Sequence, residues 1–264
     1  MPYLQYKNIT VYYNMEGTGL PVLLLHGYLE NSQSWGLFAS LLAKDFCVIA
    51  PDIPGHGASG IIADEHSMDL LADVMAYLLQ QLGMESVLCI GHSMGGYVML
   101  ALADRYPQLL RAMVMLHSTA TADTEERKKM RLQTIDALAK GDADNIIRGF
   151  VPKTFAQDNV SLFGKEIERL TDLALKTDPQ GIISLLRGMM SRPDRCHVLQ
   201  QTEVPVLFVI GKKDVFISED MALKQASMPK KADVILLNAS GHMGHIEQRD
   251  DVLQGITAFI RKSE

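Results

Sequence analysis

Short runs of consecutive hydrophobic residues recur along the chain and are separated by segments with helical spacing. The runs cover residues 22–25, 46–50, 86–91, 112–116 and 205–211. A strand that is apolar on every residue is covered on both faces, which is typical of a parallel sheet between two layers of helices. Residues 68–82 place leucine and valine three and four positions apart, which predicts an amphipathic helix. The alternation therefore predicts a mostly parallel, doubly wound α/β sheet.

Two segments depart from this alternation. Residues 3–13 alternate polar and apolar positions around a turn-like Lys7-Asn8, which predicts an antiparallel hairpin at the sheet edge. The segment between His117 and Val206 is far too long for a single crossover helix. It contains four helical patterns, at residues 124–139, 142–150, 162–176 and 179–190. We expect a helical cap inserted after the sixth strand, with a core of residues 1–118 and 204–264 and a cap of residues 119–203.

Charge and composition narrow the range of partners. The net charge of −6 argues against a nucleic acid or an anionic membrane as the partner. The densest basic group, Arg127-Lys128-Lys129 with Arg131, follows two glutamates and is interpreted as a solvated helix face. The three cysteines lack the spacing of metal ligands, and neither a cofactor nor a metal is predicted. We find no secretory signal and no stretch of 18 apolar residues, so the expected location is the cytoplasm. Nothing in the pattern indicates an oligomeric state.

A nucleophile motif lies between a predicted strand and a predicted helix. Gly91-His92-Ser93-Met94-Gly95 matches G-x-S-x-G in the context that this motif requires. The sharp turn from strand to helix strains the serine backbone, so its flanking positions must be small. The motif predicts Ser93 as a nucleophile raised above the strand ends, near the positive end of the helix.

The residues that activate such a serine follow later strands. Asp214 comes directly after the strand at 205–211, and His242 comes after the next strand, at 234–237. The order of serine, acid and histidine is the one this topology requires, so we assign His242 as the base and Asp214 as its orienting acid. His245 is the competing base, and its position at the start of the terminal helical segment favours local packing instead. A turn or helix-cap role is the alternative for Asp214.

Two backbone N–H groups are needed to stabilise the oxyanion of the reaction. One is expected from Met94, the residue after the nucleophile, and the other from Tyr28 in the loop that follows residues 22–25. Gly27 lets this loop approach the substrate closely.

Several motifs together resemble the α/β-hydrolase superfamily. They are His26-Gly27-Tyr28, Asp52-Ile53-Pro54-Gly55-His56-Gly57, Gly91-His92-Ser93-Met94-Gly95-Gly96, Gly211-Lys212-Lys213-Asp214 and Gly241-His242. The resemblance implies a Ser93–His242–Asp214 triad under a helical cap. The segment from Gly188 to Leu199, with Arg192-Pro193-Asp194-Arg195 before the strand at 205–211, looks like small esterases, enol-lactonases and cofactor-free haloperoxidases. The serine nucleophile disfavours dehalogenase and epoxide hydrolase chemistry. Tyr97 stands where the menaquinone-pathway members tend to carry an arginine, which disfavours that activity as well.

The sequence of the cap indicates only some features of the substrate. Leu186, Met189 and Met190 are candidate pocket residues, as is His117 at the end of the sixth strand, with ordinary packing or loop hydrogen bonding as the alternative. We expect a small ester-like substrate, cleaved as a carboxylic ester or lactone through an acyl-enzyme. The alternatives are a thioesterase, a hydrolase of a C–C bond in a keto acid, and a ligand receptor without activity. The C–C reaction calls for cationic groups near the site, and the sequence alone places none there.

Overall fold

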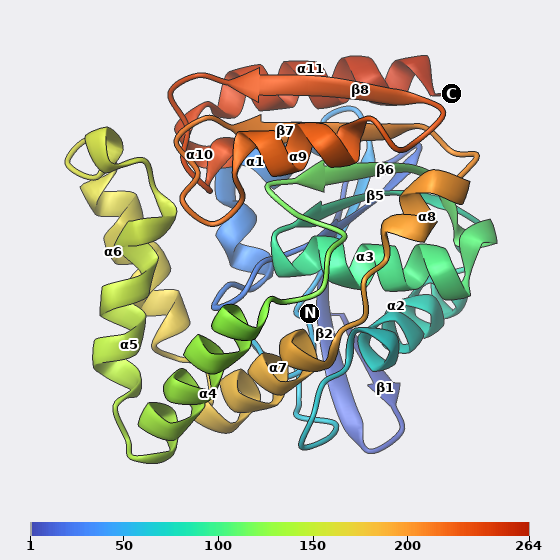
Figure 1. The fold of residues 1–264 in the computed structure, drawn as a ribbon. Helices are drawn as coiled ribbons and strands as arrows, with labels where there is room; N and C mark the ends of the chain where they lie inside the picture. Colours follow the sequence, from blue (N-terminus) through green and yellow to red (C-terminus); the bar gives the residue numbers. More distant parts are fainter. Residues whose placement is uncertain (1, 264) are drawn as a thin grey trace.

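The computed structural model describes residues 2–263, in which the eight strands form one sheet in the order β1-β2-β4-β3-β5-β6-β7-β8 (Figure 1). The strands are β1 (Tyr3–Tyr6), β2 (Ile9–Glu16), β3 (Pro21–Leu25), β4 (Cys47–Pro51), β5 (Val87–His92), β6 (Leu110–Leu116), β7 (Val206–Gly211) and β8 (Ala232–Leu237). The β1–β2 hairpin is antiparallel, as is the pairing of β2 with β4, and the pairings from β4 through β8 are parallel. The predicted fold class is therefore confirmed, including the edge hairpin.

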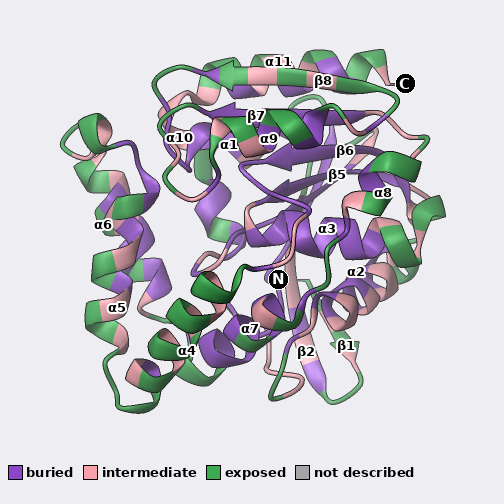
Figure 2. Ribbon diagram, viewed as in Figure 1, coloured by how far each residue is buried: buried purple, intermediate pink, exposed green. Residues whose placement is uncertain are grey.

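The helices are α1 (Gly36–Leu42), α2 (Met68–Gln81), α3 (Met94–Arg105), α4 (Glu125–Ala139), α5 (Ala143–Phe150), α6 (Gly164–Ala174), α7 (Pro179–Ser191), α8 (Cys196–Gln201), α9 (Glu219–Ala226), α10 (Gly244–Glu247) and α11 (Arg249–Lys262). Both faces of the sheet are covered, one by α2 and α3 and the other by α1 and α11. Strand side chains alternate between the two faces: Val87 and Cys89 of β5 pack with α2 and α3, whereas Leu88 and Ile90 pack with α1 and α11. The strands β3 to β7 are buried along almost their whole length, which explains their continuous apolar runs (Figure 2).

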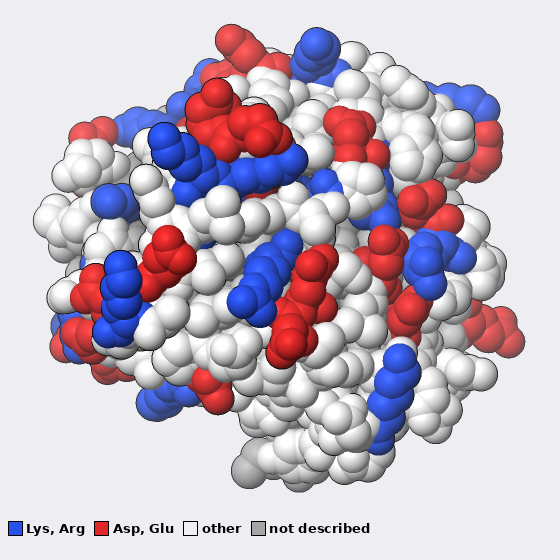
Figure 3. Space-filling model, turned by 60° about the horizontal axis from the view of Figure 1, so that its bottom comes forward, with Lys and Arg blue, Asp and Glu red and all other residues white. Residues whose placement is uncertain are grey.

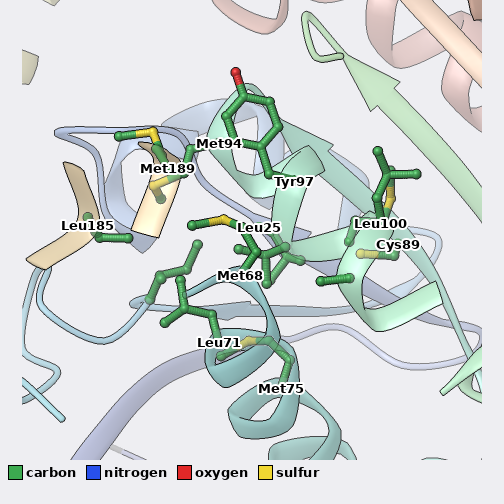
Figure 4. Close-up of a cluster of buried hydrophobic side chains, with 14 of the residues drawn as sticks. Leu25, Met68, Leu71, Met75, Cys89, Met94, Tyr97, Leu100, Leu185 and Met189 are labelled. Carbon is green, nitrogen blue, oxygen red and sulfur yellow. The ribbon is translucent and has the colours of Figure 1, made fainter. Parts of the chain in front are cut away.

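Helices α4 to α8 lie between β6 and β7 in the sequence, which confirms the predicted helical insertion after the sixth strand. The residues at which we divide core from cap, 118/119 and 203/204, stay a prediction. The cap has no separate interior, because Leu185 and Met189 of α7 join Met68 of α2 in one buried cluster (Figure 4). A Cβ on Gly188 would lie 1.7 Å from the carbonyl oxygen of His66, so α7 packs directly on the core backbone.

Candidate active site

Ser93 occupies a strained turn between β5 and α3. Its backbone has φ 50° and ψ −114°, a conformation that residues other than glycine rarely adopt. The Ser93 N–H donates to Leu116 O at 3.0 Å, and Ser118 Oγ donates to Ser93 O at 2.7 Å. A Cβ on Gly95 would lie 2.0 Å from Leu25 O, so only glycine lets the new helix start this close to β3. These hydrogen bonds and this close packing keep the Ser93 backbone in its strained conformation, at the turn where the hydroxyl stands above the sheet.

Asp214 and His242 meet where β7 and β8 end. His242 Nδ1 lies 2.7 Å from Asp214 Oδ2, and both side chains are buried. The other carboxylate oxygen of Asp214 accepts the N–H groups of Phe216 at 2.8 Å and Ile217 at 3.1 Å. Burial opposes the negative charge, but the adjacent His242 and the hydrogen bonds from His117 and His242 outweigh it and hold the pKa of Asp214 far below its usual range. An ionised Asp214 keeps the proton of His242 on Nδ1, which leaves Nε2 free to accept a proton.

Ser93 and His242 line the same cavity. Among residues 2–263, Ser93 Oγ makes no hydrogen bond, so the structure brings serine and histidine to one cavity without a bond between them. Catalytic hydrogen bonds of this kind are often long in free enzymes and tighten with substrate bound.

For His117 the sequence left two roles open, pocket lining and hydrogen bonding, and its surroundings favour the second, because it does not line this cavity. The side chain is buried behind the cavity, where Nδ1 lies 3.3 Å from Asp214 Oδ2 and Nε2 accepts the N–H of Gly244 at 3.2 Å. Accepting at Nε2 places the proton on Nδ1, so neutral His117 donates to Asp214. Burial lowers the pKa of His117 to about 4. His117 is therefore a second support for Asp214.

His245 lies away from the cavity, packed with its ring 4.9 Å from the rings of both Trp35 and His92. Burial lowers the pKa of His245 well below 6.5, so the ring is neutral. These surroundings agree with the expectation of local packing.

An ion pair beneath the site was not predicted. His92 Nδ1 lies 3.0 Å from Glu30 Oε1, and His92 Nε2 donates to the carbonyl of His242 at 2.9 Å. Burial disfavours both charges, yet each partner stabilises the other, so the pKa of His92 is raised and that of Glu30 is lowered to about 2. The sequence predicted only that His92 turns away from the hydroxyl, and no sequence signal pairs positions 30 and 92.

Two backbone N–H groups are free near Ser93. In the loop after β3, the N–H of Gly27 donates to Glu30 Oε2 and that of Leu29 to His56 Nε2, which fixes the backbone on both sides of Tyr28. Within the described part of the chain, no acceptor takes a hydrogen bond from the N–H of Tyr28 or from that of Met94. The two groups named in the sequence analysis are thus not used by the protein's own described acceptors.

The cavity above Ser93 has a volume of about 630 Å³ and is roofed by the cap. Leu186 and Met189 of α7 line it, as expected, together with side chains from α4 and α5. Met190 does not, because one further residue along a helix turns the side chain by about 100°. The interpretation of the basic group on α4 as a solvated face is wrong for two of its members, since Arg127 and Arg131 line the cavity.

His117, Asp214 and His242 also form the one group of potential metal ligands found within residues 2–263, with donor atoms within 4.8 Å of one another. Their facing atoms are already joined through hydrogen bonds, and a metal would have to displace the protons on both Nδ1 atoms. The donor set therefore fits a proton-transfer network better than a metal site.

No helix within residues 2–263 has the length and apolar content to cross a membrane.

Comparison with known proteins shows which proteins share this fold. The structure superposes on a thermophilic esterase from Thermogutta terrifontis, solved with malate bound, with a TM-score of 0.95, 27% identity and coverage of 100% of this chain and 99% of that one. An enol-lactonase from Burkholderia xenovorans LB400 shares the fold at a TM-score of 0.91 and 20% identity, over 98% of this chain and 100% of that chain.

A curated relative, the 2-hydroxy-6-oxononadienedioate/2-hydroxy-6-oxononatrienedioate hydrolase of Burkholderia vietnamiensis, is 25% identical over 96% of this chain and 92% of its own length. The family model described as alpha/beta hydrolase fold matches residues 21–166, and the chain belongs to this family.

Proposed function

We propose that the protein hydrolyses a carboxylic ester or a lactone through an acyl-enzyme on Ser93. The observation that carries the proposal is the strained Ser93, which shares a cavity wall with His242, whose Nδ1 is held by a buried Asp214. This is the arrangement of nucleophile, base and orienting acid that acyl transfer requires.

In the first half of the reaction, His242 Nε2 takes the hydroxyl proton as Ser93 Oγ attacks the acyl carbonyl carbon. The tetrahedral intermediate collapses when the bond from carbon to the leaving oxygen breaks, and His242 returns the proton to that oxygen. In the second half, water attacks the acyl-enzyme with His242 again as the base, which releases the carboxylic acid and restores Ser93. A lactone yields the hydroxy acid by the same steps.

The oxyanion is assigned to the N–H groups of Tyr28 and Met94. Both are free of protein acceptors in the described residues, and Met94 is the first residue of α3, so its N–H also carries the positive end of the helix dipole. Such donors lower the barrier because the negative charge develops only during the reaction.

Similar proteins support this assignment within limits. The Thermogutta terrifontis protein is named an esterase, and the structure from Burkholderia xenovorans an enol-lactonase, both of which act at ester bonds. The first is 27% identical to this chain, and the second supports the fold alone because its identity is 20%.

A C–C bond hydrolase acting on a keto acid is the second candidate. One observation favours it: the cationic groups that this chemistry calls for are present in the cavity as Arg127 and Arg131. The curated relative from Burkholderia vietnamiensis is named for a hydroxy-oxo dienedioate substrate, which is consistent with this candidate.

A labelling experiment separates the enzyme from a receptor on the same fold. We expect a fluorophosphonate probe to modify the native protein at Ser93, and not the Ser93→Ala variant or the heat-unfolded protein. Ester, lactone, thioester and dienoic keto acid substrates should then be compared with Ser93→Ala as the background, which is expected to lose about 10⁴-fold or more in kcat. A native protein that is neither labelled nor active on any of the four classes contradicts the proposal.

A further inference from the structure

The cavity above Ser93 is basic although the protein is acidic. Arg127, Arg131 and Lys153 contribute to its lining, whereas no aspartate or glutamate within residues 2–263 does. The chain as a whole has a net charge of −6, and the outer face shown in Figure 3 carries acidic and basic side chains interspersed. The concentration of one sign is thus a property of the cavity and does not follow from the composition.

Arg131 forms an ion pair with a buried carboxylate. Its Nε lies 2.5 Å from Asp123 Oδ2, and Arg192 Nη1 lies 2.8 Å from Asp123 Oδ1. The Asp123 side chain is fully buried, and the Arg131 side chain is 18% exposed. Within residues 2–263 neither guanidinium group has another carboxylate partner, so the two share one negative charge and one positive charge is left over. Burial opposes the charge of Arg131, but Asp123 outweighs it and raises the pKa of Arg131. A buried excess charge is costly unless a ligand or another group offsets it.

Tyr28, which lines the same cavity as Arg131, carries an unused hydrogen-bond donor. Its hydroxyl is buried and has no hydrogen-bond partner in the described structure, and its ring packs edge-on against Phe150 at 5.4 Å between centroids. Burial raises the pKa of Tyr28, while the positive charge of Arg131 lowers it in part, so the phenol is protonated and lies within the field of Arg131. Buried polar atoms in folded proteins almost always have partners, so this hydroxyl indicates a place for a ligand acceptor.

Two further cavity residues, Arg127 and Tyr97, add polar groups to the lining. Arg127, one helical turn before Arg131 on α4, donates to the carbonyl of Phe216, which fixes its guanidinium against the loop after Asp214. The hydroxyl of Tyr97 points away from the buried apolar cluster (Figure 4), and the guanidinium of Arg192 lies 3.9 Å from the centre of the Tyr97 ring. The apolar part of the cavity, with Leu186 and Met189, therefore adjoins a cationic, donor-rich part.

We propose that the cavity recognises a substrate that carries a carboxylate in addition to the ester or lactone bond, bound by Arg131 and the Tyr28 hydroxyl with Arg127 adding charge. The substrate class is the monoester of a dicarboxylic acid, or the lactone that a hydroxy dicarboxylic acid forms with one of its two carboxyl groups. This inference rests on the proposed function, because it names the substrate class of that same site. Guanidinium groups bind carboxylates through paired, charge-assisted hydrogen bonds, which are stronger than neutral ones.

Two esters of equal shape test the proposal. One is the mono-para-nitrophenyl ester of glutaric acid, and the other has an isopropyl group where the free carboxylate stands. We expect wild-type kcat/KM to be higher for the anionic ester, and the ratio of the two values to fall about 10- to 100-fold in Arg131→Met, the range for a hydrogen bond to a charged group. Tyr28→Phe, which keeps the backbone N–H, should lower the ratio about 10-fold. Ser93→Ala supplies the background rate of the self-hydrolysing anionic ester.

The matched control is Lys129→Met, which removes a positive charge from the exposed side of α4 and should leave the ratio unchanged. Arg131→Lys guards against misfolding of Arg131→Met, because it retains the charge next to Asp123 and should give an intermediate ratio. Raising the salt concentration should lower the wild-type ratio.

The outcomes separate this inference from the proposed function. If Ser93 is labelled and the neutral ester is turned over, but the wild-type protein shows no preference for the anionic ester, the carboxylate site is overturned and the hydrolase proposal stands. If neither labelling nor turnover occurs, the hydrolase proposal fails, and the site is then judged by calorimetric binding of glutarate to the unmodified protein. Binding that is lost in Arg131→Met supports the carboxylate site, and absence of binding overturns it.

Discussion

The strand ends and the cap contribute to the same cavity, but they relate to the sequence in opposite ways. Ser93, Asp214 and His242 each follow a parallel strand, and the carboxyl ends of parallel strands meet at one edge of the sheet. The cap residues of the cavity come from α4, α5 and α7, whose orientation depends on how these helices pack. Topology therefore places the proposed catalytic residues, whereas the packing of the cap helices determines which other side chains line the cavity.

Helix α4 illustrates the second half of this comparison. Leu138 is its one buried residue, and its sequence is so rich in charge that helical spacing indicates no inward face. Arg127 and Arg131 are four residues apart and thus lie on one side, but nothing local determines whether that side meets water or the cavity. Pairing with Asp123 from the preceding loop turns it inward.

The largest expected effect tests the strand ends. His242→Ala should lower kcat by about 10⁴-fold, because the nucleophile loses its base. His245→Ala should lower the melting temperature, since its ring packs on Trp35, and change kcat less than 10-fold in the folded protein. Ester hydrolysis and thermal unfolding are measured on both variants. Equal losses of kcat would mean that the two histidines have been assigned wrongly.

A smaller effect is expected from the second support of Asp214. His117 has φ 48°, a conformation that asparagine tolerates, so His117→Asn removes the ring without adding backbone strain. Because Asp214 loses one donor, we expect kcat to fall about 10-fold while KM stays within a factor of two. A rise in KM without a fall in kcat would instead place His117 in substrate binding.

Acid should destabilise the protein through histidines that are buried in the neutral form. Burial lowers the pKa of His56 to about 3, and those of His66 and His117 to about 4, against 6.5 for the free side chain. Below pH 6.5 the unfolded chain takes up protons that the folded protein refuses, so stability is complete above pH 6.5 and declines toward pH 4. Each group contributes up to about 1.4 kcal/mol per pH unit to the free energy of unfolding.

Urea unfolding at several pH values measures this decline. In His66→Gln, the free energy of unfolding should fall less steeply with decreasing pH, by the contribution of about one proton. A free energy of unfolding that stays constant between pH 6.5 and pH 4 would show that these rings are protonated in the folded protein.

The smallest expected effect concerns the apolar side of the cap. Met189→Ala should widen the cavity and shift the preference toward longer acyl chains by about 3- to 10-fold in relative kcat/KM. Met190→Ala is the matched control, because the neighbouring methionine does not line the cavity and should leave the preference as it is. A series of para-nitrophenyl esters of increasing chain length provides the measurement. Equal shifts in both variants would mean that the side chain of Met189 does not determine the chain-length preference.

Predictions from the sequence were most accurate where a local rule applies. The elbow at Ser93 needs small neighbours and a strand followed by a helix, and both features are visible within ten residues. Local rules did not predict the ion pairs of Glu30 and Asp123. Glu30 pairs with the distant His92, and Asp123 pairs with Arg131 in the next helix and with the distant Arg192. No periodicity in the sequence marks either carboxylate.

The sequence by itself determined the parallel sheet, the helical insertion after β6, and the arrival of Ser93, Asp214 and His242 at strand ends, because strand burial and turn geometry depend on neighbouring residues. Only the tertiary structure decided that His117 supports Asp214 and that Arg131 faces the cavity. The first of these contacts joins segments far apart in the chain, and the second depends on how α4 packs. The energy of both depends on desolvation and charge pairing, which exist only after the cap has packed on the core.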